Sequence, residues 1–365
     1  MMIFDADHPL SPELNSALVA RIDRCLMSHR AHLEALEGTS SHLTDLFNQA
    51  HRYATAGKGI RSALCLWSHL ATSGELPDEG VWDVAASVDL LHGSALVHDD
   101  IIDRSMSRRG WPSAHRFFSE THQQRQWASD PDHFGLAAGI IVGDLLLAWS
   151  NSLFNNAHLL ESSRSVARQF FVDVQTEVLA GQYLDLLSEA RHLSTELVLT
   201  DARLIMEYKT ARYTIARPAQ IGAALAGATP DQLQALAVFG EHIGRAYQMR
   251  DDLLGVFGDP QLTGKPRGDD ILLGKKTMLL GYALDSATKE QKSSLTTLWG
   301  NGDLSEHQVD LVCQILIDTG AVQRSEQVIN EDKNQGLTIL QSLEFTEVGL
   351  SGLKKLVDIC VERES

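Results

Sequence analysis

The sequence predicts an all-α protein, folded as one large helical-bundle domain over residues 1–365. Apolar residues recur at a spacing near 3.6, as at Val84, Val88 and Leu91, which is the period of a helix with one buried face. Runs of alternating β-branched residues, which are typical of strands, are nearly absent. The prolines fall at breaks beside Gly, Asp or Ser. Helical patterning of similar composition resumes after each break, so no interdomain linker is predicted.

The expected elements follow in chain order. Residues 84–97 are strongly apolar and predict a buried helix. Residues 119–133 are polar and patternless, which predicts a surface loop. Residues 134–143 are the most apolar stretch, but Asp144 interrupts it well before the roughly 20 residues that a membrane span needs. Residues 232–256 again show helical spacing, and residues 259–268 predict a second loop.

Composition and charge exclude several classes of protein. Hydrophobic residues make up 44% of the 365 residues and charged residues 22%, which suits a globular chain with a sizeable core. Lys plus Arg number 31 and Asp plus Glu number 48, so the net charge is −17. A nucleic acid or an anionic membrane is therefore not expected to bind the surface as a whole. A local cationic pocket remains compatible with this balance.

The four cysteines, Cys25, Cys65, Cys313 and Cys360, lie far apart and form no CxxC pair. This spacing argues against a disulfide framework and against a structural zinc site. The first ten residues contain neither the basic segment nor the apolar segment of a signal peptide. We therefore expect a cytoplasmic protein with reduced, buried cysteines and without a membrane span.

The strongest sign of chemistry is the acidic motif HDDIIDR at residues 98–104. Asp99 and Asp103 are four residues apart, about 40° around a helix, so both carboxylates face one side. Two carboxylates without a cysteine suit a hard cation such as Mg²⁺, which shares its shell with waters and phosphate oxygens. An isolated motif of this kind is more often a solvated acidic face. Here it ends an apolar helix, which favours the metal site.

A second acidic pair, Asp251 and Asp252, follows GRAYQMR at residues 244–250 on another apolar helix. A solvated acidic face would have to arise twice by chance. Two acidic clusters on separate apolar helices instead indicate one shared cavity that holds metal ions.

Basic residues beside glycine or beside the acids complete the pattern. They are Lys58, Arg61, Arg108, Arg109, Lys209 and Lys265. Lys58 and Arg61 in GKGIR are three residues apart and share one helix face behind flexible glycines. Arg and Lys are the usual phosphate ligands, so the set indicates an anionic, phosphorylated substrate. GKGIR is not a P-loop, because the GxxxxGK[ST] spacing and a preceding strand are absent.

With these motifs in this order, the chain resembles the trans-isoprenyl diphosphate synthases, the polyprenyl synthetase family. GKGIR, DDIIDRSMSRRG, GQYLD, YKT and YQMRDDLLGVFGDPQLTGKPRGDD carry the resemblance, which covers residues 57–277. Within the family the chain is most similar to bacterial geranylgeranyl diphosphate synthases. The resemblance implies an isoprenoid-synthase bundle with a central cavity and a homodimer. It also implies a Mg²⁺-dependent enzyme that joins isopentenyl diphosphate head to tail to dimethylallyl, geranyl or farnesyl diphosphate.

The resemblance further implies a role for each matching residue. The metal ligands, for about three Mg²⁺ ions on the allylic diphosphate, would be Asp99, Asp103, Asp251 and Asp252. Contacts to the allylic diphosphate would come from Arg108, Lys209 and Lys265. Contacts to isopentenyl diphosphate would come from Lys58, Arg61, His92 and Arg109. Thr210 and Gln248 would lie beside the forming carbocation. Independently of the family, His92 precedes Asp99 by seven residues, about −20° around a helix, and so shares its face.

Two positions depart from the family pattern. Ser62 stands where the family often has Pro after the Arg of its first basic motif, and we expect only a local change of backbone. Gly255 stands where the second motif usually has a third Asp. Because water can fill a vacant Mg²⁺ position, we expect an active enzyme with weaker metal binding there. Gly255→Asp should then leave turnover similar or lower the Mg²⁺ requirement.

Product length should depend on the depth of the apolar cavity beneath Asp99. Ser94 and Ala95, five and four residues before Asp99, are small, whereas an aromatic residue here gives a C15 product in the resembling family. Their size favours a product of C20 or longer, with Leu91, Ser87 or a facing residue near Trp149 closing the cavity deeper down. Small residues also permit close helix packing, and the sequence leaves that alternative open.

Other functions fit the motifs less well. A terpene cyclase would carry an NDxxSxxxE-type second site, which is absent, and would not need GKGIR. A non-catalytic regulatory subunit of a heteromeric synthase tends to lose one acidic motif, whereas this chain keeps most of both. We therefore predict a trans-prenyltransferase that makes geranylgeranyl diphosphate. A longer-chain polyprenyl diphosphate synthase and the regulatory subunit are the alternatives.

Overall fold

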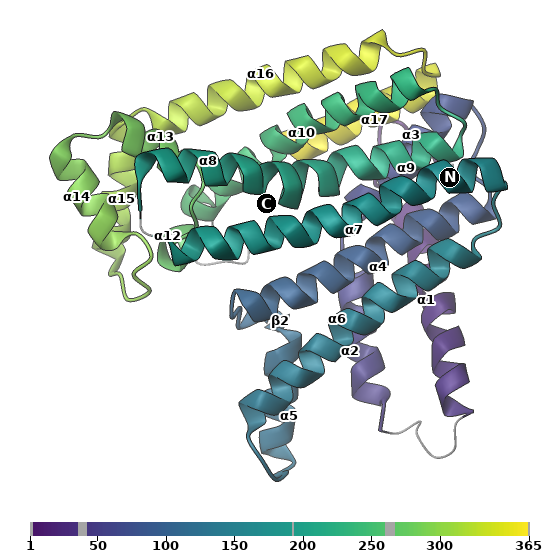
Figure 1. The fold of residues 1–365 in the computed structure, drawn as a ribbon, viewed down its shortest axis with the longest axis horizontal. Coiled ribbons are helices and arrows are strands. Elements are labelled where there is room, and N and C mark those ends of the chain that lie inside the picture. The colour runs from purple at the N-terminus through teal and green to yellow at the C-terminus, as the bar shows by residue number, and fades with distance from the viewer. Residues whose placement is uncertain (1–2, 36–41, 192, 260–266, 364–365) are drawn as a thin grey trace. The chain divides into compact units, whose positions relative to one another are not determined.

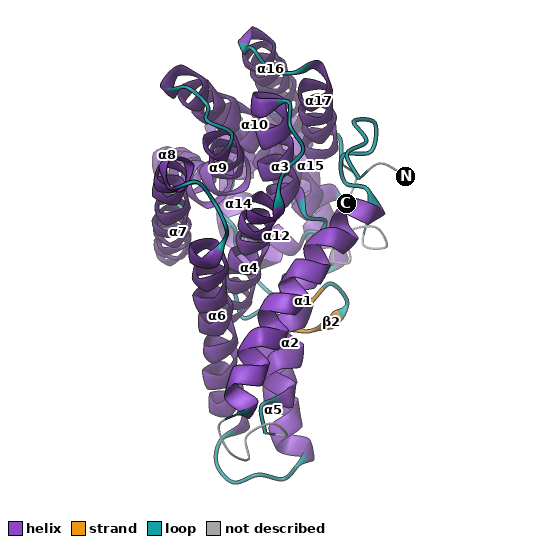
Figure 2. Cartoon of the chain, turned by 90° about the vertical axis from the view of Figure 1, so that its right-hand side faces the viewer, coloured by secondary structure: helices purple, strands orange, loops and turns teal. Residues whose placement is uncertain are grey.

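The computed structural model describes residues 3–35, 42–191, 193–259 and 267–363, and helices account for nearly all regular structure there (Figure 1). The elements in order are α1 (Pro12–Glu34), α2 (Thr44–Thr55), α3 (Ile60–Ser73), α4 (Glu79–Ile102), β1 (Ser107–Arg108), β2 (Trp111–Pro112), α5 (Ala114–Gln124), α6 (Pro131–Asn156), α7 (Glu161–Ala190), α8 (Thr195–Ile205), the π-helix η1 (Met206–Ala216), α9 (Arg217–Leu225), α10 (Pro230–Phe257), α12 (Asp269–Leu273), α13 (Met278–Ser286), α14 (Lys289–Leu298), α15 (Glu306–Asp318), α16 (Ala321–Ser342) and α17 (Glu347–Val361). The short pair β1–β2 is the only sheet in the described residues (Figure 2). The all-α prediction is confirmed.

Contacts within the chain define two compact units, and each is described by itself. Unit 1 comprises Met1–Gln169, Pro218–Thr229 and Phe345–Leu353, and unit 2 comprises Phe170–Arg217, Pro230–Glu344 and Lys354–Ser365. Both units are discontinuous in sequence. Of the five boundaries, three fall inside α7, α9 and α17, one lies immediately before α10, and one lies between α16 and α17. The single domain over residues 1–365 stays a prediction.

In unit 1, α4 is the central helix and packs against α6. Asp78 caps its N-terminus, where the carboxylate accepts a hydrogen bond from Val81 N at 2.9 Å. Small residues on α6 let the two helices approach closely. A β-carbon on Gly143 would lie only 2.1 Å from His98 Nε2. The tight crossing fixes the end of α4, where the first acidic motif lies.

In unit 2, α10 packs between η1 and α16. A β-carbon on Gly244 would lie 2.2 Å from Ala211 Cα of η1, so only glycine permits this crossing. On its other side, Arg245 Nε donates to Asp332 Oδ2 of α16 at 2.6 Å, and His242 Nδ1 lies 2.7 Å from Asp332 Oδ1. These contacts hold the segment of α10 that leads to the second acidic motif.

The structure corrects the predicted loop over residues 119–133. Helix α5 extends to Gln124 and α6 begins at Pro131, so only residues 125–130 connect the two helices. His122 is buried, with Nε2 2.9 Å from Ala128 O, and its ring packs against Trp127 and Phe134. Although most residues of this segment are polar, the rings of His122, Trp127 and Phe134 form a cluster that fixes the connection.

Helix α6 also continues through Asp144, where the sequence predicted the end of the apolar stretch. By length and composition it could cross a membrane, and 33% of its apolar window is buried inside the structure. This is weak support for a span, because core helices of soluble proteins have the same length and composition. The four cysteines are buried, as predicted, and none of them forms a disulfide.

Candidate active site

The first acidic motif lies at the C-terminal end of α4 in unit 1. Asp103 caps the helix, and its N–H donates to Asp99 O at 2.8 Å. The side chain of Asp99 is 22% exposed, whereas that of Asp100 is fully buried. Because successive helical residues point about 100° apart, the two adjacent acids face different surroundings. Asp99 and Asp103 are available to a ligand, and Asp100 is part of the interior.

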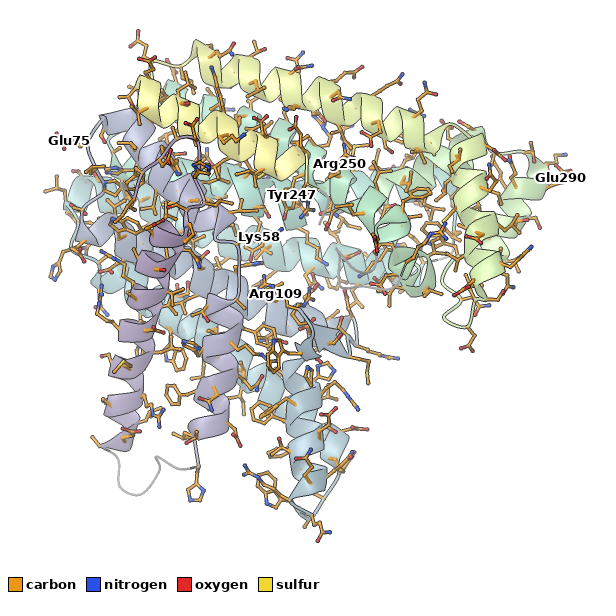
Figure 3. All side chains as sticks on the ribbon, turned by 180° about the vertical axis from the view of Figure 1, so that it is seen from behind. Lys58, Glu75, Arg109, Tyr247, Arg250 and Glu290 are labelled. Atoms are coloured by element: carbon orange, nitrogen blue, oxygen red, sulfur yellow. The ribbon has the colours of Figure 1, made fainter. Side chains whose placement is uncertain are left out.

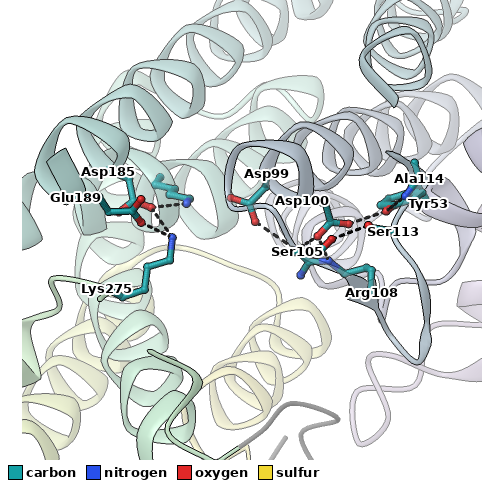
Figure 4. Close-up of polar contacts among 11 residues, drawn as sticks. Tyr53, Asp99, Asp100, Ser105, Arg108, Ser113, Ala114, Asp185, Glu189 and Lys275 are labelled. Carbon is teal, nitrogen blue, oxygen red and sulfur yellow. Dashed lines mark hydrogen bonds and ion pairs between the residues drawn. The ribbon is translucent and has the colours of Figure 1, made fainter. Parts of the chain in front are cut away.

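Asp100 anchors a cation beside Asp99. Arg108 Nε and Nη2 donate to Asp100 Oδ1 at 2.8 and 2.5 Å, and Nη2 reaches Asp99 Oδ2 at 3.3 Å (Figure 4). The Tyr53 hydroxyl donates to Asp100 Oδ2 at 2.6 Å and accepts a hydrogen bond from Ala114 N at 3.0 Å. Burial, followed by the charge of Asp100, raises the pKa of Tyr53. Asp100 therefore holds Arg108 in place rather than binding a metal ion.

The β1–β2 hairpin brings two arginines to the end of α4. Its two-residue turn, Arg109 and Gly110, has φ values of 52° and 79°, the geometry of a type I′ turn. A non-glycine residue in this region costs about 1 kcal/mol, which the surrounding contacts offset. Arg52 contributes to these contacts by donating to Pro112 O at 2.5 Å.

Arg109 faces the basic motif GKGIR, so unit 1 contains a cluster of cations. A β-carbon on Gly57 would lie 3.8 Å from Arg109 Nη2, and Gly59 enters α3 with a φ of 66°. Burial lowers the pKa of His92 well below its usual value, and the charges of Arg61, Arg109 and Arg108 lower it further. Burial also lowers the pKa of Arg109, with contributions from Arg108 and Arg61. Cations that destabilise one another in this way favour a bound anion.

Lys58 lies in the same loop and is exposed to solvent (Figure 3). The structure thus brings together four of the residues expected at the isopentenyl diphosphate site: Lys58 and Arg61 at the start of α3, His92 on α4 and Arg109 in the hairpin turn. Their assignment to that substrate stays a prediction.

Ser62 does more than alter the local backbone, so that expectation is wrong. Its buried hydroxyl lies 3.0 Å from Gly59 O and hydrogen-bonds the carboxyl of Asp89. Burial raises the pKa of Asp89 to about 6, although Ser62, Arg61 and Arg109 act to lower it. Asp89 is thus a half-buried acid beside the cation cluster that the motif search missed.

In unit 2, Lys209 and Thr210 lie in the π-helix η1. Short π-helical segments are frequent at functional sites, and this one spans Met206–Ala216. Lys209 Nζ donates to Asp185 Oδ2 at 2.6 Å. Lys275 Nζ donates to Glu189 Oε1 at 2.8 Å and lies 3.6 Å from Asp185 Oδ2 (Figure 4). Two lysines therefore converge on one acid of α7.

A hydrogen-bonded chain joins three of the predicted site residues. Thr210 Oγ1 donates to Gln248 Oε1 at 2.5 Å, and Gln248 Nε2 donates to Asp252 Oδ1 at 2.8 Å. The two contacts fix both ends of the amide. Gln248 is therefore held rigidly between η1 and the second acidic motif.

The two acids of the second motif also differ in burial. Asp251 is exposed, whereas Asp252 is buried. Burial raises the pKa of Asp252 well above its usual value, and the charges of Asp270, Asp251 and Asp185 raise it further. This excess of negative charge and the all-oxygen donors fit a hard divalent cation.

In the part of the chain that the structure describes, no group of three or more His, Cys, Asp or Glu side chains could hold a metal ion. A Mg²⁺ site does not require such a group, because Mg²⁺ usually takes one or two carboxylates and completes its shell with waters and substrate phosphates. The four predicted ligands, Asp99, Asp103, Asp251 and Asp252, occur as one pair in each unit.

The missing third acid of the second motif has a structural counterpart. A β-carbon on Gly255 would lie 2.2 Å from Asp270 Oδ2. The absence of a side chain at Gly255 thus makes room for the carboxylate of Asp270, which comes from α12. An aspartate at position 255 would first displace Asp270, so the expectation for Gly255→Asp changes.

Lys265, Ser94, Ala95 and Trp149 are the remaining residues singled out in the sequence. Lys265 lies outside the described residues. Ser94 is buried and Ala95 half-buried on α4. Trp149, a candidate for closing the cavity, is buried and stacks between His29 and Phe47, with ring centroids 5.5 and 5.3 Å away.

The motif search assigned no role to several residues that contact the predicted set or its immediate partners: Tyr53, Asp89, Asp100, Asp185, Glu189, Asp270, Lys275 and Arg363. Asp185 and Lys275 were within reach of sequence reasoning, since Asp185 ends the motif GQYLD and Lys275 follows a Gly. The others depend on contacts between distant segments.

Comparison with known proteins identifies the family. The polyprenyl synthetase family model matches residues 44–316. A short chain isoprenyl diphosphate synthase from Methanothermobacter thermautotrophicus is 30% identical over 317 residues, covering 86% of this chain and 89% of the relative. An all-trans-nonaprenyl-diphosphate synthase from Rhodobacter capsulatus is 28% identical, covering 84% and 86%.

Solved structures agree with these relatives. A geranylgeranyl pyrophosphate synthase from Corynebacterium glutamicum, solved with isoprenyl diphosphate and magnesium, is 34% identical, with a TM-score of 0.88 over 98% of this chain and 99% of the other. The family match includes all the motifs from GKGIR to the second acidic pair. The chain therefore belongs to the polyprenyl synthetase family of trans-prenyltransferases.

Proposed function

We propose that this enzyme is a Mg²⁺-dependent synthase that condenses isopentenyl diphosphate with allylic diphosphates and releases geranylgeranyl diphosphate (C20). The observation that carries the proposal is the cation cluster of unit 1. The charges of Arg61 and Arg109 help to lower the pKa of His92, and those of Arg108 and Arg61 help to lower the pKa of Arg109, in a chain with a net charge of −17. A diphosphate relieves that repulsion, since guanidinium groups bind its oxygens with charge-assisted hydrogen bonds.

In unit 1, we assign isopentenyl diphosphate to Lys58, Arg61, His92 and Arg109. The lowered pKa of His92 keeps its imidazole neutral near pH 7, so it binds as a hydrogen-bond donor rather than as a cation. Arg108, held by Asp100, would donate to the allylic diphosphate beside Asp99. Because this donor is already oriented, little reorganisation is needed as the leaving group gains charge.

In unit 2, Lys209 and Lys275 would contribute positive charge that stabilises a diphosphate leaving group. Bound Mg²⁺ would neutralise the diphosphate at Asp99, Asp103, Asp251 and Asp252 and so promote its departure. Gln248 is held by Thr210 and Asp252, which keeps its amide dipole fixed near the forming allylic carbocation. The similar synthase from Corynebacterium glutamicum, solved with magnesium, supports this assignment.

The product length follows from small residues on α4. Ser94 and Ala95 leave room for a chain beyond C15, and the stacked ring of Trp149 is a rigid candidate for the cavity floor. We expect Ser94→Phe to shorten the product to C15 or less. The matched variant Ser94→Ala should leave the product unchanged. An unaltered product from Ser94→Phe would show that Ser94 serves helix packing instead.

The central test is product analysis by mass spectrometry. The protein is incubated with isopentenyl diphosphate, Mg²⁺ and, separately, C5, C10 and C15 allylic diphosphates. A dominant C20 diphosphate supports the proposal. Longer products point to a polyprenyl diphosphate synthase, the reaction class of the Rhodobacter capsulatus relative. A folded protein that elongates none of the starters would instead be a non-catalytic subunit.

We also propose a cytoplasmic homodimer. Helix α6 exposes Leu136, Ile140 and Ile141, each 41–50% accessible, along one side of the helix. An apolar face of this kind favours contact with a second copy. Light scattering of the wild type and of Ile140→Asp tests it, since the charged variant should be monomeric. The buried, reduced cysteines support the cytoplasmic location.

A further inference from the structure

In unit 2, the end of the chain contacts the second acidic motif through Arg363. Its Nη2 donates to Asp251 Oδ1 at 2.6 Å, and its Nη1 donates to the Tyr247 hydroxyl at 3.0 Å. The guanidinium carbon lies 4.0 Å from the centroid of the Tyr247 ring, which adds a cation–π contact. The side chain of Arg363 is only 16% exposed. A cation from the chain itself therefore neutralises the exposed acid of this motif.

Arg250, in the same region of unit 2, makes a more complete set of hydrogen bonds. Arg250 donates through Nη1 and Nη2 to Glu326 Oε1 and Oε2 at 2.7 and 2.8 Å, and through Nε to Val361 O at 3.0 Å. The two-point pair with Glu326 and the bond to Val361 O together engage all three nitrogens, and the latter fixes the backbone at the end of α17.

The contact of Arg363 is weaker by comparison. It reaches one oxygen of Asp251, and its buried Nε has no acceptor within the described ranges. A guanidinium with an unsatisfied N–H is less stable than a two-point pair, so its carboxylate is easier to take over. The backbone of α17 would stay in place meanwhile, because Lys333 Nζ lies 2.8 Å from Asp358 Oδ1 and Arg250 Nε donates to Val361 O at 3.0 Å.

We propose that Arg363 is the resting counter-ion of Asp251 and that a divalent cation binding at Asp251 displaces it. This inference rests on the proposed metal role of Asp251. The guanidinium and the metal ion would compete for the same carboxylate and repel each other across it. Metal loading therefore releases the Arg363 side chain, and the resting enzyme binds its first metal ion more weakly than the carboxylates alone would.

Mn²⁺ provides a direct test, because the electron paramagnetic resonance signal of the free ion reports binding without turnover. Arg363→Gln should lower the Mn²⁺ dissociation constant by about fivefold, since one competing charge is removed. The matched control is Lys355→Gln, which removes one charge from an exposed position on α17, the helix that precedes Arg363. It should bind Mn²⁺ like the wild type. An Arg363→Gln variant that binds no more tightly than Lys355→Gln overturns the proposal.

Two further variants separate the possible failures. Arg363→Lys keeps the charge and should bind Mn²⁺ within about twofold of the wild type. Asp251→Asn should weaken Mn²⁺ binding strongly. If Asp251→Asn has no effect, the metal assignment of Asp251 fails, and the displacement fails with it. If Asp251→Asn weakens binding but Arg363→Gln does not tighten it, only the displacement is wrong.

Hydrogen–deuterium exchange of the wild type gives an independent reading that needs no variant to fold. Mn²⁺ with inorganic pyrophosphate should increase amide exchange at residues 362–363, while exchange at residues 354–360 stays unchanged. Unchanged or slower exchange at residues 362–363, with Mn²⁺ bound, contradicts displacement.

Discussion

The two acidic motifs look alike in sequence, but units 1 and 2 balance their charges in different ways. In unit 1, the buried acid Asp100 is fully paired with Arg108 and Tyr53. In unit 2, the buried acid Asp252 faces Asp251, Asp270 and Asp185, and these neighbours add to the rise in its pKa. The first motif thus carries its cation permanently, whereas the second has excess negative charge.

This difference suggests a division of labour. A preorganised guanidinium suits a phosphate group that must always be held in one orientation. A cluster of repelling carboxylates suits metal ions that bind together with the substrate and leave with the product. The temporary pairing of Asp251 with Arg363 fits the second case.

The largest loss of activity is expected from substitution of the partly exposed acids of unit 1. Asp99→Ala or Asp103→Ala should reduce kcat by about 10³-fold or more, because metal-assisted departure of the leaving group is lost. Steady-state rates over a range of Mg²⁺ concentrations measure this loss. Circular dichroism should show intact helices, since both side chains lie at the end of α4. Rates near wild type in either variant would remove the metal assignment of the first motif.

Asp100→Asn tests whether the permanent pair acts through Arg108. The variant keeps the shape but leaves Arg108 and Tyr53 without the carboxylate, so kcat should fall about 100-fold and Tm by several degrees. The Mg²⁺ dependence should stay as in the wild type, since Asp100 is assigned no metal. A large increase in the required Mg²⁺ would mean that Asp100 is a ligand after all.

Gly255 offers a smaller and sharper test in unit 2. Gly255→Ala places a β-carbon against Asp270 and should raise the Mg²⁺ concentration for half-maximal rate about fivefold, if Asp270 supports the metal site. Gly255→Asp displaces Asp270 too but supplies a carboxylate, so it should fall between Gly255→Ala and the wild type. Equal Mg²⁺ dependence in all three proteins would show that Asp270 is not involved.

The smallest expected effect is a change of thermal stability, and it concerns Asp89, the half-buried acid beside the cation cluster. The pKa of Asp89 rises from 3.8 to about 6 on folding, so the folded state binds its proton more tightly than the unfolded state does. Its contribution to stability is therefore present below pH 4 and is lost as the pH rises to about 6. Asp89→Asn should raise Tm relative to the wild type at pH 7.5 and less so at pH 4.5.

Differential scanning calorimetry at the two pH values measures this change. Glu75→Gln in the same unit is the control, because Glu75 is exposed and should show no such difference (Figure 3). A Tm gap for Asp89→Asn that is independent of pH would refute the shifted pKa.

Residue spacing alone predicted the helical class of this chain, and the resemblance of its short motifs to a known family predicted the family. The period of 3.6 identifies the buried faces, and Asp99 with Asp103 share a side because four residues make about one turn. The order of short motifs from GKGIR to the second acidic pair was enough for the family. All of these depend on residues close together in sequence, where helix geometry fixes relative position.

Only the tertiary structure decided how the charges are paired. Asp99 and Asp100 are adjacent aspartates that the sequence alone does not distinguish. Packing buries Asp100 against Tyr53, which lies 47 residues earlier in the chain. Packing also places Asp270 beside Gly255. It brings Arg363 into contact with Asp251, which lies 112 residues earlier in the chain. Such pairs depend on how closely helices cross, which no local periodicity records. Burial then decides which carboxylates stay neutralised and which remain open to a metal ion.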